Sequence, residues 1–402
     1  MELNLDRTRK YVVGVSGGSD SMTLLDLLVK QGYMVVVCHV NYHHRATSDR
    51  DENIVKDYCM KHNVKVYVNN PQYPGKENFQ KWAREVRYKF YYQIYIKHQC
   101  SGLLLAHQMD DHIENYLMAK NRGSKSYYYG IREKVKLYDM EVIRPLLRMR
   151  KKDTENYCID NNITYGLDES NLSDDYYRNR IRHQYIETAS DEQINSWLLE
   201  IDELNKEIER KISDYKKIDF NKEIACSVLS DIEDQSLFLR YYLNYFICDE
   251  VFSSGLIEEI KKIIINNSSN HLVEIADYNF VCEYGFFYVY KKEKGYSYQL
   301  DTIEYLDNEY FRLSNKGEKI QQVTVFKQDL PITIRNYQKN DKIELRYGTK
   351  KVNRFFIDRK IRKKDRDRWP VMVNKENEVI FVSGIGCDVN HYTTKPNLFV
   401  IK

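Results

Sequence analysis

The 402-residue chain is long enough for roughly two to four domains, and its 42% hydrophobic and 30% charged residues exclude wholesale disorder. The net charge of +3, from 62 basic and 59 acidic residues, is too small to indicate a class of partner. The first residues do not have the pattern of a secretory signal, so we expect none. There is no run of the roughly 20 apolar residues that span a membrane, and no CxxC pair among the eight cysteines. We therefore expect a cytoplasmic protein with free thiols, no membrane partner, and neither a zinc nor an iron–sulfur centre.

The first half of the chain alternates between strand and helix patterns. Short apolar runs, typical of buried strands, occupy 11–15, 33–40, 64–68 and 103–106. Helical patterns follow them at 21–30, 49–62, 77–98 and 110–121. This alternation predicts βαβ units, and therefore a parallel sheet with helices on both faces. Ligands of such sheets bind beyond the carboxyl ends of the strands.

The pattern changes after about residue 190. A long polar helix is predicted at 191–217, mainly helical structure at 223–265, and an alternating β-hairpin at 271–292. A polar stretch near 293–320 precedes a final α+β-like segment. We therefore expect a catalytic domain at 1–190, a helical linker at 191–218, a middle domain at 219–295 and a C-terminal domain at 321–402.

The strongest local signal is the string SGGSDS between the first predicted strand and helix. It comprises Ser16, Gly17, Gly18, Ser19, Asp20 and Ser21. The glycines let the backbone approach a ligand closely, the serines supply hydroxyl donors, and the next helix presents unpaired N–H groups, which together suit a pyrophosphate. No Gly-Lys-Ser/Thr and no GxGxxG is present, which excludes a Walker-type loop and a dinucleotide fingerprint. The alternative is an ordinary glycine-rich turn.

A second loop, AHQMDDHIENYLM at 106–118, follows the fourth predicted strand. Asp110 and Asp111 begin the next helix, and Glu114 lies one turn further on, so the three carboxylates are neighbours. Such a cluster suits Mg²⁺, an ammonium group or a general base. The alternative is that these acids only complement the helix dipole. Their position at the same sheet edge as SGGSDS favours a functional role.

Basic residues gather at three further places. Arg84 and Arg87 lie three apart on a predicted helix. Arg178, Arg180 and Arg182 could bind phosphate through bidentate hydrogen bonds, or form surface salt bridges with nearby acids. The segment 350–368 holds ten Lys or Arg against three Asp, a net charge of +7, which suits RNA phosphates or a solvated helix face. Aromatic residues in and beside this segment, Phe355, Phe356 and Trp369, are expected to pack in a core rather than stack on bases.

The SGGxDS string after the first strand resembles the PP-loop ATP pyrophosphatase superfamily. A longer ordered set of strings resembles one of its families, tRNA(Ile)-lysidine synthase. In chain order these strings are SGGSDS, HVNYHHR (39–45), WAREVRY (82–88), AHQMDDHIEN, IRPLL, DESN with RNRIRH (168–183), ITIRNYQKNDKIEL (332–345), FFIDRKIRKKDRDRWPVM (355–372) and VSGIGCD (382–388). Gln108, Asn115 and the segment 122–125 depart from the family pattern.

The resemblance implies an α/β fold: a parallel-sheet PP-loop domain of the adenine nucleotide α-hydrolase type, a mainly helical middle domain and a small α+β C-terminal domain. It implies that ATP adenylates the C2 oxygen of the wobble cytidine in the CAU anticodon of tRNA(Ile), and that L-lysine then displaces AMP. Asp110, Asp111, Glu114, Arg84 and Arg87 would be catalytic, with Mg²⁺ on Asp110 and Asp111. The tRNA-binding residues would be Arg178, Arg180, Arg182, Arg359, Lys360, Arg362, Lys363 and Lys364.

Other readings remain open at the level of the sequence. Another PP-loop tRNA-modifying enzyme is one, although a thiolase typically needs cysteine pairs and an amidating synthetase a glutaminase domain, and neither is evident. A non-catalytic RNA-binding protein is another, against which the intact SGGSDS string argues. The sequence leaves protein partners unassigned, a homodimer included.

Overall fold

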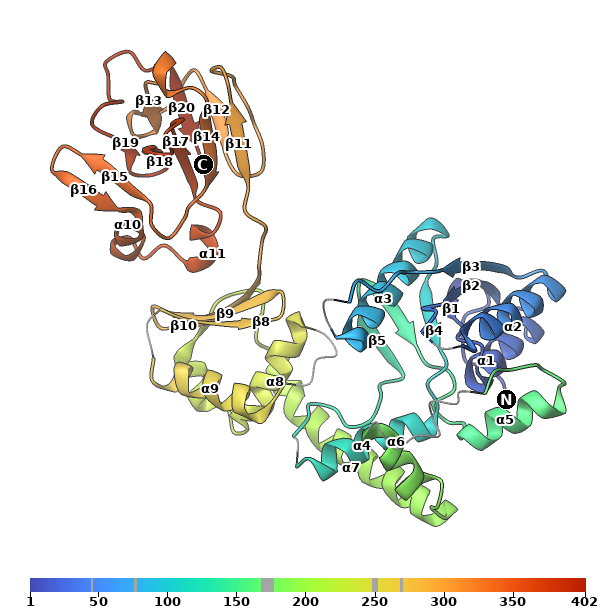
Figure 1. The fold of residues 1–402 in the computed structure, drawn as a ribbon. Coiled ribbons are helices and arrows are strands. Elements are labelled where there is room, and N and C mark those ends of the chain that lie inside the picture. Colours follow the sequence, from blue (N-terminus) through green and yellow to red (C-terminus); the bar gives the residue numbers. More distant parts are fainter. Residues whose placement is uncertain (45, 76–77, 124, 168–176, 248–251, 268–269) are drawn as a thin grey trace. The chain divides into compact units, whose positions relative to one another are not determined.

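The computed structural model describes every residue except 45, 76–77, 124, 168–176, 248–251 and 268–269, so Arg45 and the DESN string at 168–171 lie outside the described residues. The chain forms two compact units, coloured along the sequence in Figure 1. The first comprises Met1–Asp219 and Ser236–Ile257, and the second comprises Phe220–Gln235 and Glu258–Lys402. Both catalytic loops predicted from the sequence fall in the first unit.

A six-stranded sheet forms the centre of the first unit. Its strands are β1 (Lys10–Gly14), β2 (Met34–Val40), β3 (Lys65–Asn69), β4 (Gly102–Leu105), β5 (Lys134–Leu137) and β6 (Met140–Ile143). They lie in the order β3-β2-β1-β4-β6-β5, all parallel except β5, which pairs with β6 as an antiparallel hairpin. The four predicted strands are confirmed, and the β5–β6 hairpin was not predicted.

Helices cover both faces of this sheet, as predicted. One face is covered by α1 (Ser19–Lys30), α2 (Ser48–Lys61) and α5 (Lys151–Asp160), and the other by α3 (Phe79–Lys97). The helix α4 (Met109–Asn121) follows β4 and packs in a separate cluster. Successive residues of a strand point to opposite faces, so Val13 of β1 packs in one buried cluster with residues of α1, α2 and α5, and Val12 packs in another with residues of α3. Both valines are fully buried, which explains why the strand reads as one continuous apolar run.

The remaining helices of the first unit are α6 (Tyr177–Ile181), α7 (Asp191–Tyr215) and α8 (Gln235–Phe246). The predicted long polar helix is therefore present as α7, with an apolar stripe on one side. Ile194 and Ile201 of that stripe are buried with Ile113 and Leu117 of α4. This contact fixes α4, and with it the predicted acidic cluster, against α6 and α7.

The second unit is rich in antiparallel strands. A four-stranded sheet is formed by β7 (Ile224–Ala225), β8 (His271–Ile275), β9 (Tyr278–Glu283) and β10 (Phe286–Lys291). The segment 271–292, predicted as one β-hairpin, forms the three antiparallel strands β8, β9 and β10, and β7 pairs with β10. The helix α9 (Ser254–Ile265) precedes β8 in the chain.

The C-terminal part carries strands β11 (Ser297–Leu300), β12 (Arg312–Ser314), β13 (Gln322–Val323), β14 (Ile332–Asn336), β15 (Lys342–Leu345), β16 (Gly348–Lys351), β17 (Pro370–Val373), β18 (Val379–Val382), β19 (Gly386–Cys387) and β20 (Leu398–Ile401), with helices α10 (Val352–Asp358) and α11 (Lys363–Arg366). The stretch near 293–320, read as polar, thus contains β11 and β12. Across the described part of the chain, no helix has the length and apolar character needed to cross a bilayer.

Candidate active site

The SGGSDS string forms a tight loop between β1 and α1, at the carboxyl edge of the sheet. Gly17 has φ +94°, and a Cβ built there would lie 2.9 Å from the backbone oxygen of Asp51, so glycine is required. The hydroxyl of Ser21 accepts the N–H groups of Ser16 and Gly17 at 3.1 Å each and donates to the oxygen of Gly18 at 3.0 Å. Helix α1 starts with Gly18 as its N-cap and no side-chain cap, which leaves its first N–H groups for an anion.

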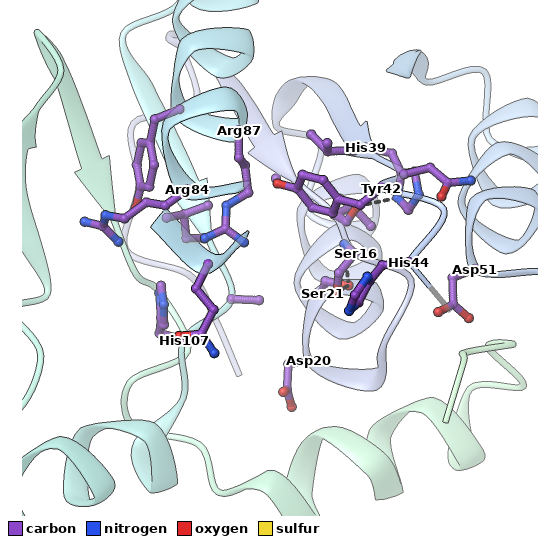
Figure 2. Close-up of a pocket in the computed structure, with 18 of the residues that line it drawn as sticks. Ser16, Asp20, Ser21, His39, Tyr42, His44, Asp51, Arg84, Arg87 and His107 are labelled. Carbon is purple, nitrogen blue, oxygen red and sulfur yellow. Dashed lines mark hydrogen bonds between the residues drawn. The ribbon is translucent and has the colours of Figure 1, made fainter. Parts of the chain in front are cut away.

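This loop opens into a cleft of about 1010 Å³. Figure 2 shows Arg84, Arg87 and His107 on one side of it, and Ser16, Ser21, Tyr42 and His44 on the other. The volume is at the upper end of the range of small-molecule sites, and the wall of aromatic rings with a few polar groups is typical of them. The cleft is also lined by three aromatic and three charged residues, which are Phe79, Tyr88, Tyr91, Asp20, Asp51 and Arg178.

Arg84 and Arg87 both reach the cleft from α3, as their spacing predicted. Their guanidinium carbons lie 4.8 Å and 5.9 Å from the centre of the Tyr88 ring. Among the described residues, Arg87 has no carboxylate partner. An arginine side chain is always protonated in a protein, so Arg87 brings an uncompensated positive charge to the cleft. A half-buried guanidinium beside aromatic rings is a ready site for a phosphate or carboxylate of a ligand.

His107 lines the cleft as a neutral imidazole. Burial lowers the pKa of His107 to about 4, and the neighbouring charge of Asp111 only partly opposes this shift. The Nε of Arg144 donates to the Nδ1 of His107 at 3.3 Å. His112 is structural instead: its ring contacts the backbone of Ile131 and fills the space beside Gly130.

The three predicted carboxylates lie together at the start of α4, but each of their oxygens already has a donor. Asp110 accepts from the Nε of Arg150 and, at 2.9 Å, from the backbone N–H of Lys151. Asp111 accepts from Arg178 at 2.7 Å and from the backbone N–H of Gln108 at 3.0 Å. Asp110, Asp111 and Glu114 are absent from the residues that line the cleft.

Glu114 is the most deeply buried of the three. Its side chain is fully buried, and its two oxygens accept from the Nε atoms of Arg178 and Arg182 at 2.5 Å each. These two arginines were predicted to bind tRNA, with salt bridges as the alternative, and the structure shows the salt bridges. Arg178 nevertheless reaches the cleft, whereas Arg180 is exposed and stacks over Tyr177.

The carboxylates do not fit a Mg²⁺ held by the protein alone. Within the described ranges, no group of three or more His, Cys, Asp or Glu side chains is arranged to hold a metal ion. Mg²⁺ in nucleotide sites is held by one or two carboxylates together with phosphates, and both oxygens of Asp110 and of Asp111 are taken. The predicted Mg²⁺ on these residues therefore gains no support from their contacts.

Asp20 is the acid of the SGGSDS loop, and it lines the cleft. Its Oδ2 accepts from the Nζ of Lys151 at 3.0 Å, and its Oδ1 accepts from the hydroxyl of Thr154 at 2.6 Å. Burial raises the pKa of Asp20, and these two partners oppose the shift. Sequence reasoning missed Lys151 and Thr154, because they lie 131 and 134 positions after Asp20 and only the packing of α5 on α1 brings them there.

The basic run of the second unit divides into exposed and engaged residues. Arg359 and Lys360 are exposed at the end of α10. Arg362 and Lys364 form ion pairs with Glu223 at 2.5 Å and 3.3 Å, and burial lowers the pKa of the half-buried Lys363. Phe355, Phe356 and Trp369 pack together in one cluster, which confirms their expected role in a core.

Comparison with known proteins gives consistent matches over both units. A model of the PP-loop domain matches residues 2–189, and a model of the TilS substrate C-terminal domain matches residues 332–398. The chain is 31% identical over 401 residues to a protein of Mycoplasma mycoides named tRNA(Ile)-lysidine synthase, covering 94% of this chain and 97% of that one. Proteins of the same name from Ureaplasma parvum and Bacillus subtilis are 35% and 28% identical, over 80% and 96% of this chain and 93% and 92% of theirs.

Proposed function

The chain belongs to the tRNA(Ile)-lysidine synthase family of ATP-using PP-loop enzymes, and from that membership we propose that it joins L-lysine to C2 of the wobble cytidine in the CAU anticodon of an isoleucine tRNA. The observation that carries the proposal is the SGGSDS loop opening into a cleft with cationic and aromatic walls. ATP, lysine and tRNA meet in the cytoplasm, and we place the reaction there.

In the first step the C2 oxygen of the cytidine attacks the α-phosphorus of ATP, and pyrophosphate leaves. The Ser16–Ser21 loop and the free N–H groups of α1 hold the phosphates. Arg87 lines the cleft and has no carboxylate partner among the described residues, so it is available to the charge that develops on the transferred phosphoryl group. Mg²⁺ accompanying the ATP remains a prediction.

In the second step the ε-amine of lysine attacks C2 and AMP leaves. The amine must first lose a proton, which costs about 4.6 kcal/mol at pH 7 from an ordinary pKa near 10.4. Neutral His107 does not repel the approaching ammonium. Which carboxylate holds the ammonium remains a prediction: the charge of Asp111 acts on His107 and Asp20 of the cleft, but both oxygens of Asp111 already accept hydrogen bonds.

The basic surface of the C-terminal domain supports tRNA binding. Arg359 and Lys360 are exposed, so we assign them to the phosphate backbone, where they position the tRNA without reading its sequence. Arg362 and Lys364 form ion pairs with Glu223, so we expect them to contribute less to phosphate binding than Arg359 and Lys360.

The test is AMP formation with tRNA transcripts. The wild-type protein should form AMP from ATP with a CAU transcript and lysine, and lose that activity when the wobble cytidine is replaced by uridine. Asp20→Ala and Asp111→Ala should abolish AMP formation while leaving tRNA binding intact, and Glu133→Ala, at an exposed acid of the same unit, should retain both. AMP formation that ignores the wobble base would contradict the proposal.

A further inference from the structure

Lys151 is the one lysine whose side chain is hydrogen-bonded to the SGGSDS loop in the described part of the chain. Its Nζ donates to the hydroxyl of Ser19 at 2.8 Å and to the carboxylate of Asp20 at 3.0 Å. The side chain is 31% exposed, and it reaches the cleft through its contact with Asp20, which lines the cleft, whereas Lys151 is not itself among the lining residues. The neighbouring Lys152 is different, because its side chain is 59% exposed and pairs with Asp191.

The position of Lys151 is fixed by contacts on both sides of the residue. Its backbone N–H donates to Asp110, which also binds the side chain of Arg150. One turn further along α5, the hydroxyl of Thr154 donates to Asp20, and the backbone oxygen of Thr154 accepts from the buried hydroxyl of Thr23 in α1 at 2.9 Å. Helices α1 and α5 are thus locked together around the loop, and Asp110 acts here as a support for Lys151.

The ammonium of Lys151 retains a donor for a ligand. A lysine ammonium has three N–H groups, and Ser19 and Asp20 use two of them. Glu155 lies 3.9 Å away, which is beyond hydrogen-bond distance. The negative charge of Asp20 would by itself repel a polyphosphate bound in the loop, and the positive charge of Lys151 offsets this repulsion.

We propose that Lys151 binds the β- and γ-phosphates of ATP and stabilises pyrophosphate as it leaves, with Ser19 and Asp20 holding its ammonium in place. The proposal rests on the proposed ATP-dependent function. A bond forms between the cytidine O2 and the α-phosphorus, and the bond from that phosphorus to the α,β-bridging oxygen breaks. The electron pair leaves with pyrophosphate. Lys151 stays protonated throughout and donates a hydrogen bond to a pyrophosphate oxygen.

The proposal predicts which ligands lose affinity when Lys151 is changed. Lys151→Met should weaken the binding of inorganic pyrophosphate and of ATP by roughly 10- to 100-fold, the range for a lost hydrogen bond between charged groups. The binding of AMP, which has only the α-phosphate, should stay within about twofold of wild type. A disordered loop would weaken all three ligands together, so AMP separates a lost contact from a damaged loop.

Isothermal titration of the full chain with pyrophosphate, ATP and AMP measures these affinities. Lys152→Met is the matched control and should bind all three like wild type, and Lys151→Arg should recover most of the pyrophosphate affinity. Unchanged pyrophosphate affinity in Lys151→Met, or an equal loss for AMP, would overturn the proposal. Failure of the proposed function would show separately, as a wild-type protein that binds pyrophosphate but forms no AMP with any tRNA transcript.

Discussion

Replacing Glu114 by Gln removes the charge at the centre of a buried ion-pair network without changing the volume of the side chain. Glu114 is fully buried, and Arg178 and Arg182 each donate to it at 2.5 Å. Among the described residues, the carboxylate that then remains beside both guanidinium groups is Asp111, at 2.7 Å and 3.5 Å. Breaking a buried pair costs about 3–5 kcal/mol. Because Asp111 remains and Arg178 is 44% exposed, we expect the lower end, about 3 kcal/mol.

Urea denaturation followed by circular dichroism measures this loss of stability in the first unit. Glu200→Gln is the matched control, since Glu200 pairs with Lys120 at 2.7 Å on the surface, where both side chains are more than two-fifths exposed. Removing that pair should cost less than about 1 kcal/mol. Because Arg178 lines the cleft, Glu114→Gln should also weaken ATP binding. If Glu114→Gln is no more destabilising than Glu200→Gln, the network does not hold α4 and α6 together as argued.

Three further changes test separate parts of the molecule. Arg87→Met should lower AMP formation at least 100-fold, on the order of losing one transition-state donor, without lowering the thermal midpoint; a parallel loss of folding would make Arg87 structural. Arg359→Gln with Lys360→Gln should reduce the slope of log affinity for tRNA against log salt by roughly 0.9 per lost phosphate contact, and an unchanged slope would remove them from the interface. Burial alone would lower the pKa of His391, but Asp388 and Asp329 raise it, so the folded state binds the proton more tightly. The stability that protonated His391 adds is complete below about pH 6.5 and is lost as the pH rises through the raised pKa. The difference in the free energy of unfolding between wild type and His391→Gln should therefore shrink from about pH 6 to pH 9. A difference that grows over this range would contradict the reasoning.

The sequence predicted those parts of the fold that depend on the pattern of apolar residues and glycines within a short segment. β1 is recognised as a strand because Val12 and Val13 pack in opposite, equally buried clusters. The glycines after it indicate a tight loop, and Gly17 has a positive φ. The β5–β6 hairpin escaped prediction because its strands have only four residues and its turn uses Tyr138 and Asp139, both with positive φ, in place of glycine.

The candidate site was predicted only where its residues adjoin one another in the sequence. Asp20 and Arg87 belong to compact strings and reach the cleft as expected. Glu114 could either act in catalysis, as predicted, or pair with Arg178, and the position of α6 decides between the two. No local sequence pattern encodes that position. Lys151 lies far along the chain and reaches the loop only through the packing of α5 on α1. The residue types in the sequence indicated the kind of chemistry. Which side chains pair with one another, as Glu114 does with Arg178 and Lys151 with Asp20, was visible only in the tertiary structure.

Transfer of lysine to the tRNA is the direct test of the account. The wild-type protein, ATP, Mg²⁺ and radiolabelled L-lysine would be incubated with an isoleucine tRNA transcript carrying the CAU anticodon, and the label retained on the tRNA would be counted. We predict stable label that disappears when the wobble cytidine is changed and when Asp20 is replaced by Ala. Release of pyrophosphate without any label on the tRNA would contradict lysine as the nucleophile and leave only the adenylation chemistry standing.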